Sequence, residues 1–183
     1  MVSRIKLYLQ SRKYVLLFCI LFFLIRLPLL DQTNLLHDER DIVLSGYSIA
    51  KFGTDLYGTS FPMVFDGISP KNPVVAIYFS ALSWLFFPIR TIFFARLPFV
   101  FISSFILLLT YEIILTLTKN KKNSIITALI FCFSPWIYHL TRLAMDINLA
   151  FVLLLAGMLL YFKKKTNPVV SFFYTRMLHI SGI

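Results

Sequence analysis

Acidic residues are scarce in this sequence of 183 residues: eight Asp and Glu stand against 18 Lys and Arg, and charged residues make up only 14%. Hydrophobic residues reach 58%, which is more apolar surface than a soluble domain can bury. The composition therefore argues against a soluble globular protein and indicates a polytopic membrane protein. The basic residues cluster at the ends of apolar runs, so the net charge of +10 indicates orientation in a membrane and no nucleic-acid partner.

Cysteine is also scarce. Cys19 and Cys132 both lie inside apolar runs, where a thiol usually behaves as a small hydrophobic group, so neither a disulfide nor a metal site is predicted. The sequence contains no zinc-ligand spacing, no phosphate-binding P-loop and no Gly-x-Gly-x-x-Gly pattern. Asp38 and Glu39 alone offer too few ligands to argue for a divalent ion, and no cofactor is predicted.

Four apolar runs predict membrane-spanning helices, at residues 14–30, 91–118, 124–140 and 147–162. The first run follows a basic segment and is longer than the apolar core of a signal peptide. No Ala-x-Ala-like cleavage site follows it. We therefore expect an uncleaved helix in the cell membrane with a cytoplasmic N-terminus, followed by an outer loop over residues 31–90.

Residues 73–87 form a shorter apolar run of about fifteen residues, below the roughly twenty that a span needs. If this run does not cross, the lysines at 119–122 and 163–165 lie on the cytoplasmic side, as the positive-inside tendency favours. We therefore predict a re-entrant or juxtamembrane helix there. This topology leaves only Glu112 inside a span and places the other acids on the outer side: Asp31, Asp38, Glu39, Asp41, Asp55, Asp66 and Asp146.

The outer loop itself predicts a helix over residues 38–52, with Ile42, Gly46 and Ile49 on one side, followed by turn residues at 53–58. The fold expected is therefore all-α, a polytopic transmembrane helix bundle with juxtamembrane helices in the first outer loop. After residue 165 an apolar pattern restarts and then breaks, which predicts the truncated start of a further helix over 166–183 and suggests that the chain is the front part of a longer protein.

Asp38 is the candidate for chemistry, because a carboxylate just outside a membrane helix can act as a general base. Adjacent helical residues diverge by about 100°, so Glu39 is expected to orient a neighbour, Arg40 or Arg142. The alternative for Asp38, together with Asp41, is to cap the N-terminus of the helix.

Three basic residues are expected at the same interface and are candidates to bind an anionic group of a substrate: Lys71, Arg142 and Arg96. Arg142 and Asp146 share a helix face if the last helix begins early, in which case a purely structural ion pair is the alternative.

Six short features occur in an order that resembles the GT-C membrane glycosyltransferases, in the bacterial branch related to protein O-mannosyltransferases and lipid A aminoarabinose transferases. The resemblance covers about residues 14–165. It is carried by Asp38-Glu39, Gly53-x-Asp55-x-x-Gly58, Lys71-Asn72-Pro73, Ala95-Arg96-Leu97-Pro98, Ser134-Pro135-Trp136 and Arg142-x-x-x-Asp146.

The resemblance implies an enzyme that transfers a sugar, usually with inversion, from a polyprenyl-phosphate carrier to a glycan, lipid or protein acceptor on the outer face. It implies that Asp38 is the catalytic carboxylate and Asp146 the second acidic position. Lys71 matches a basic residue that approaches the carrier phosphate, although Asn72 intervenes where many relatives read Lys-Pro.

Two other function classes stay open. A transporter or channel would carry charged residues within its membrane spans. Here only Arg26, Arg96 and Glu112 lie within the predicted spans. An inactive remnant or a membrane-embedded structural subunit is the second alternative.

Arg26 is expected to extend to the outer interface, with ligand binding as its alternative. The run at 73–87 carries aromatics that predict an interface belt: Tyr78, Phe79, Trp84, Phe86 and Phe87.

Overall fold

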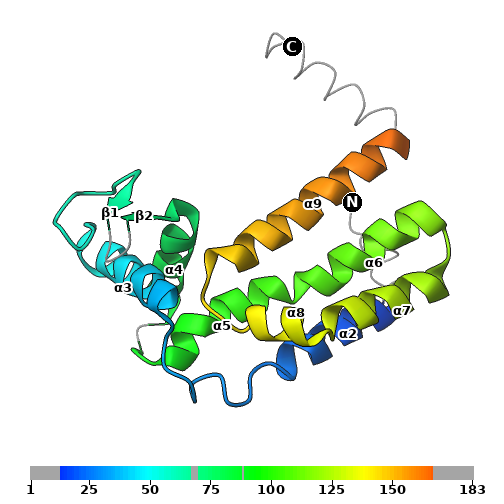
Figure 1. The fold of residues 1–183 in the computed structure, drawn as a ribbon, viewed down its shortest axis with the longest axis horizontal. Coiled ribbons are helices and arrows are strands. Elements are labelled where there is room, and N and C mark those ends of the chain that lie inside the picture. The colour runs from blue at the N-terminus through cyan, green and yellow to red at the C-terminus, as the bar shows by residue number, and fades with distance from the viewer. Residues whose placement is uncertain (1–12, 67–69, 88, 167–183) are drawn as a thin grey trace, which may run out of the picture.

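The computed structural model describes residues 13–66, 70–87 and 89–166 (Figure 1). The described chain is mainly helical, as expected, with one short antiparallel strand pair that the sequence did not predict. The elements are α2 (Lys13–Leu24), α3 (His37–Phe52), β1 (Phe65–Asp66), β2 (Pro70–Asn72), α4 (Val74–Phe86), α5 (Ile92–Ser103), α6 (Phe105–Thr118), α7 (Lys121–Cys132), α8 (Pro135–Leu140) and α9 (Asp146–Thr166).

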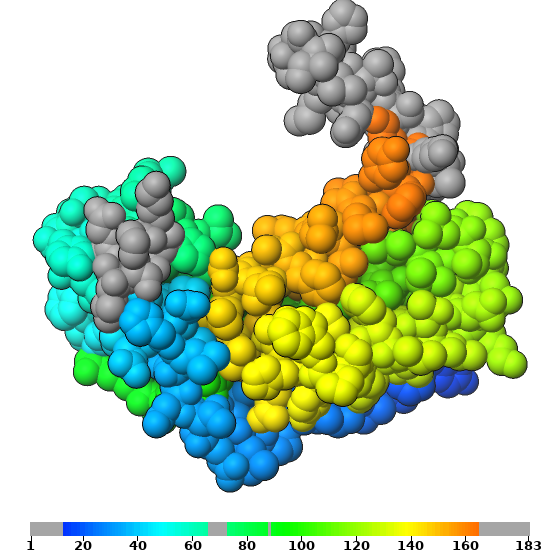
Figure 2. Space-filling view, viewed as in Figure 1, coloured from blue at the N-terminus to red at the C-terminus, as the bar shows by residue number. Residues whose placement is uncertain are grey.

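Two apolar cores organise these helices. The first lies where α4 packs on α3 and on α5, and includes Ile42, Ile77 and Phe99. The second lies between α2, α6, α7 and α9, and includes Phe22 and Ile106. Figure 1 and Figure 2 show α3 and α4 at one end of the molecule and the long helices extending away from them. The two groups are linked by α5, which continues into α6, and by the start of α9, which contacts α4 and α5.

Two helical stretches are long and apolar enough to cross a membrane, judged by length and composition. The first joins α5 to α6 over Ile92–Thr118, which at 27 residues is about 40 Å long. The second is α9, in which Asp146–Lys164 spans 19 residues, or about 28 Å. These stretches coincide with two of the four expected spans, 91–118 and 147–162.

The other two expected spans are not continuous helices. The run at 14–30 is helical only as far as Leu24, because Pro28 cannot continue a helix and disfavours helical geometry in the residue before it. The run at 124–140 divides into α7 and α8, because Ser134 caps a new helix through Ile137 N (3.4 Å) and Pro135 occupies its first turn.

The helix predicted over 38–52 is confirmed as α3, and its predicted inner residues Ile42, Gly46 and Ile49 are all buried. A Cβ atom at Gly46 would lie 2.6 Å from Ser80 Oγ, so glycine allows α3 and α4 to approach closely. The predicted turn at 53–58 is confirmed as well. Gly53 ends α3 in the left-handed conformation (φ 71°), and Asp55 Oδ1 accepts hydrogen bonds from Tyr57 N (2.9 Å) and Thr59 N (2.8 Å).

The short helix expected at 73–87 is confirmed as α4, whose 13 residues are about 20 Å long. Its aromatic residues do not form the single exposed belt that was expected. Phe79 and Trp84 pack into the first core, whereas Phe86 is 72% exposed. The prediction of an interface belt is therefore wrong for Phe79 and Trp84, because Phe79 packs against Phe99 of α5 and Trp84 packs against Tyr47 of α3.

Candidate functional site

Glu39 and Arg96 form a fully buried ion pair between α3 and α5. Arg96 Nε donates to Glu39 Oε1 (2.9 Å) and Arg96 Nη2 donates to Glu39 Oε2 (2.7 Å), which is the bidentate geometry of a strong pair. The sequence predicted Arg40 or Arg142 as the partner of Glu39. That prediction is wrong, since the side chain of Arg96 extends from α5 to the first turn of α3.

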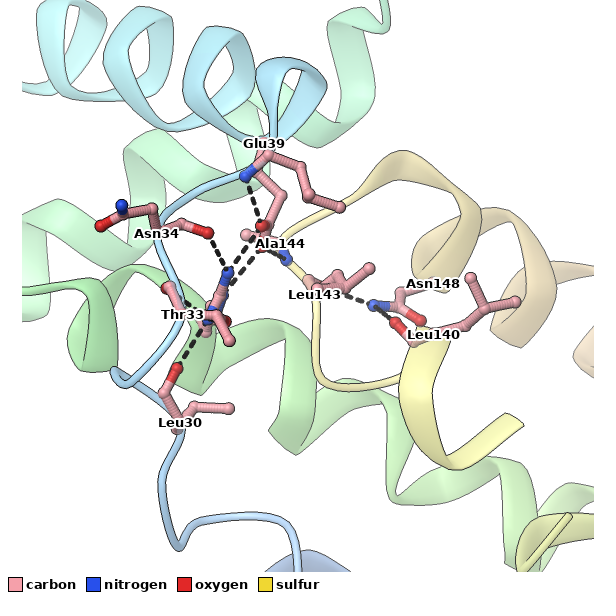
Figure 3. A network of polar contacts seen from close by, with 10 residues as sticks. Leu30, Thr33, Asn34, Glu39, Leu140, Leu143, Ala144 and Asn148 are labelled. Carbon is pink, nitrogen blue, oxygen red and sulfur yellow. Dashed lines mark hydrogen bonds and ion pairs between the residues drawn. The ribbon is translucent and has the colours of Figure 1, made fainter. Parts of the chain in front are cut away.

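The remaining donors of Arg96 hold the segment that leads into α3. Arg96 Nη1 donates to the carbonyl of Leu30 (2.7 Å) and to the Thr33 hydroxyl (2.9 Å), and Nη2 donates to the carbonyl of Asn34 (3.3 Å) (Figure 3). A guanidinium has five N–H donors, and all five have acceptors here. Arg96, expected to bind substrate, therefore has its donors occupied within the protein.

Glu39 also joins α3 to the segment before α9. Its Oε1 accepts a hydrogen bond from Ala144 N (2.7 Å), and its Oε2 accepts one from Leu36 N (3.0 Å) (Figure 3). The second bond satisfies a free amide at the start of α3, so Glu39 performs the capping role that the sequence offered as an alternative for Asp38. The first bond fixes the two helix starts at one end of the molecule.

Asn148 stabilises this arrangement and was missed by sequence reasoning. Its Nδ2 donates to the carbonyls of Leu143 (2.6 Å) and Leu140 (3.2 Å), and its side chain is buried (Figure 3). An asparagine in an apolar run is the only sequence signal for this role. Asn148 thus holds the turn that presents Arg142 and Ala144.

The two candidate catalytic acids lie at these helix starts. Asp38 is in the first turn of α3 with 68% of its side chain exposed, and Asp38 Oδ1 lies 3.9 Å from Nδ1 of His37. Asp146 is the first residue of α9 and is exposed. The Glu39–Ala144 bond therefore joins the neighbours of both acids, one residue from Asp38 and two from Asp146.

Arg142 faces a cavity beside this junction. It precedes α9, so it shares no helix with Asp146 and the two form no ion pair among the described residues. Arg142 Nη2 instead donates to the carbonyl of Pro28 (2.6 Å), and Nη1 lies 3.5 Å from the Tyr138 hydroxyl. These two contacts leave three of its five N–H donors without an acceptor in the described part of the chain.

The cavity has a volume of about 230 Å³. It lies between the segment that leaves α2 and the end of α8, and its lining includes Arg96, His139 and Arg142 together with Thr33 and Tyr138. No carboxylate is among the described residues that line it. The charge of Arg96 is balanced by Glu39, so Arg142 supplies the positive charge that suits the cavity to an anionic group.

Arg26 is buried behind this cavity, so the expectation that it extends to the interface is wrong. Its Nε donates to Thr141 Oγ1 (2.8 Å), and its Nη1 and Nη2 donate to the carbonyls of Phe22 (2.9 Å) and Cys132 (3.4 Å). The guanidinium carbon lies 5.1 Å from the centroid of the Tyr138 ring, and that of Arg142 lies 5.6 Å from the same centroid. The two cations therefore flank one tyrosine.

Two further predictions concern residues that the structure does not place. Lys71 lies in β2, but its side chain is outside the described part of the structure. The helix start expected at 166–183 falls, from residue 167 onward, outside the described residues. Among the described residues, no three His, Cys, Asp or Glu side chains lie together in a way that could hold a metal ion.

Comparison of the chain with protein families, with curated proteins and with solved structures finds no match.

Proposed function

We propose that the chain is a polytopic membrane glycosyltransferase of the lipid-phosphate-dependent class, which uses Asp38 at the outer membrane surface. The observation that carries the proposal is the Glu39–Ala144 hydrogen bond of 2.7 Å. It holds the start of α3, with its exposed carboxylate, next to the turn that carries Arg142 and leads to Asp146. Acid and cation, 104 residues apart in the sequence from Asp38 to Arg142, thus belong to one end of the molecule.

The membrane location is supported by how little of the apolar helix surface the protein itself covers. Only 22% of the apolar window in α9 is buried. Leu153, Leu154 and Leu160 each expose about 60% of their surface, and in water such a continuous apolar face would be unfavourable. A lipid bilayer removes that penalty, so α9 is proposed to cross the membrane.

The arrangement of the lysines supports the proposed orientation. Glu112 in α6 and Lys163 in α9 form an ion pair at 3.4 Å, which places the C-terminal parts of these helices together. The lysines that follow α6 and those that end α9 consequently lie at the same end, away from α3. With this end in the cytoplasm, Asp38 and Asp146 lie on the outer side.

In the proposed reaction, the acceptor hydroxyl attacks the anomeric carbon of the donor sugar while the bond to the carrier phosphate breaks. Asp38 accepts the hydroxyl proton, and the polyprenyl phosphate leaves as an anion. Arg142 stabilises that anion with its three available donors. Arg96 holds the scaffold, since its donors are occupied, and Asp146 is the second acid at the same surface.

The test compares Asp38→Asn with Asp31→Asn, which removes an exposed carboxylate from the same outer segment. Membranes that carry each variant are supplied with a panel of polyprenyl-phosphate-linked sugars, and transfer of labelled sugar is measured. Loss of a general base lowers the rate by about 100-fold or more, so Asp38→Asn should be inactive while Asp31→Asn keeps the parent rate. Normal turnover by Asp38→Asn would show that Asp38 is not the base.

A membrane-embedded structural subunit is the second candidate, and one observation favours it. Glu39, the buried acid of the Asp38-Glu39 pair, already accepts hydrogen bonds from Arg96, Leu36 and Ala144. This network therefore needs no substrate to satisfy its carboxylate. Absence of transfer by the parent chain with every donor in the panel would favour this candidate.

A further inference from the structure

A second basic cavity lies between α3, α4 and the link to α5, apart from the Arg142 cavity. It has a volume of about 120 Å³ and is lined by Tyr47, Ala50, Lys51, Trp84 and Arg90. Tyr47 and Lys51 are four residues apart on α3 and so share a helix face. No carboxylate is among these residues, so the cavity carries two positive charges and no negative one.

The aromatic residues of this cavity position Arg90. The Arg90 guanidinium carbon lies 4.5 Å from the centroid of the Tyr47 ring, and Nη2 of Arg90 donates to the hydroxyl of Tyr47. The Tyr47 and Trp84 rings meet edge to face at 5.9 Å, and Trp84 Nε1 donates to the carbonyl of Val43 (3.3 Å). Lys51 forms no hydrogen bond or ion pair with a described residue, so its ammonium is available to a ligand.

The surface beside the cavity is apolar. Leu85, Phe86 and Ile89 follow Trp84 in the chain and precede Arg90, and they are 66%, 72% and 58% exposed. Aromatic rings, basic side chains and exposed aliphatic groups together are the residue types found where a membrane protein meets lipid head groups.

We propose that this cavity binds the phosphate head group of an anionic membrane phospholipid, with the acyl chains lying against Leu85, Phe86 and Ile89. The proposal rests on the membrane location of the chain and is independent of sugar transfer. Lys51 and Arg90 bind the phosphate, and Tyr47 holds the guanidinium in place. Such a lipid would fix α3 and α4 against the membrane surface.

The experiment uses Trp84 as the reporter, since Trp84 and Trp136 are the two tryptophans of the chain. The Trp136→Phe variant is reconstituted in phosphatidylcholine vesicles that contain a minor fraction of one brominated lipid. That lipid is either brominated phosphatidylglycerol or brominated phosphatidylcholine, and the bromine atoms on its acyl chains quench the fluorescence of nearby tryptophan. The proposal predicts stronger quenching by brominated phosphatidylglycerol. The preference for phosphatidylglycerol over phosphatidylcholine should fall about fivefold in Lys51→Gln and about fivefold in Arg90→Gln. It should also weaken with added salt.

Three controls separate the outcomes. Lys122→Gln, on α7, should keep the preference, and Arg90→Lys should keep most of it, which distinguishes lost charge from lost folding. Equal quenching by the two brominated lipids, or a preference that survives both glutamine variants, would overturn the proposal. Abolition of the preference by inorganic phosphate would identify a site for soluble anions and overturn it too. If no brominated lipid quenches Trp84, or Trp136 in the Trp84→Phe variant, the membrane location fails as well.

Discussion

Glu39 and Arg96 lie 57 residues apart in the sequence and meet as a buried bidentate pair, with Oε2 and Nη2 separated by 2.7 Å. Neither side chain reaches solvent appreciably, since the exposed fractions are 0% for Glu39 and 3% for Arg96. Removal of one partner leaves an uncompensated charge in a low-dielectric site, which is far more costly than the loss of a surface pair.

Glu39→Gln should therefore destabilise the protein by about 3–5 kcal/mol. Asp38→Asn, at the adjacent exposed position, should change the stability by less than about 0.5 kcal/mol. Thermal unfolding followed by circular dichroism in detergent micelles measures both. Arg96→Gln combined with Glu39→Gln should cost less than the two single changes together, because they remove the same pair. Additive effects would contradict the proposed coupling.

Gly46 and Gly157 should respond to alanine with opposite signs. At Gly46 a Cβ atom would lie 2.6 Å from Ser80 Oγ and 2.9 Å from Ala81 N, so Gly46→Ala forces α3 and α4 apart. The expected cost is about 1–3 kcal/mol. At Gly157 in α9 a Cβ atom meets nothing within 4 Å, so Gly157→Ala should stabilise the helix by about 0.5–1 kcal/mol. Equal unfolding temperatures for the two variants would show that α3 and α4 are not closely packed.

Periodicity and turn chemistry were sufficient to predict α3 and the turn that follows it. The spacing of Ile42, Gly46 and Ile49 identified α3 and its buried face, and Gly53 marked its end. The two long apolar stretches, α5–α6 and α9, were equally clear, since length and composition determine such helices.

Contacts between distant segments were not accessible in this way. The pairing of Glu39 with Arg96 depends on where α5 places Arg96 relative to α3, and the sequence offered the adjacent Arg40 and the more distant Arg142 as partners instead. Arg26 was assigned to the interface because long basic side chains usually extend to water, but Thr141 and two backbone carbonyls hold it inside. The ends of α2 and α7 depend on Pro28 and Pro135, which interrupt apolar runs whose length and composition alone predict continuous helices.

The orientation of the chain can be tested with single cysteines. In a background that lacks Cys19 and Cys132, a membrane-impermeant maleimide should label Tyr57→Cys in intact cells. Lys121→Cys and Lys164→Cys should be labelled only after permeabilisation, because both lysine groups are expected in the cytoplasm. Labelling of position 121 from outside would reverse the topology and place Asp38 on the wrong side for the proposed chemistry.

Arg142 is proposed to bind the phosphate of a lipid-linked sugar, and the lipid bound to the purified protein tests this binding most directly. Mass spectrometry of the parent chain, extracted in mild detergent, should show a polyprenyl-phosphate species. Arg142→Gln should lose that species, whereas Lys122→Gln, on α7, should retain it. Only bulk phospholipid in the parent sample, or equal retention of the polyprenyl species by Arg142→Gln, would contradict the claim.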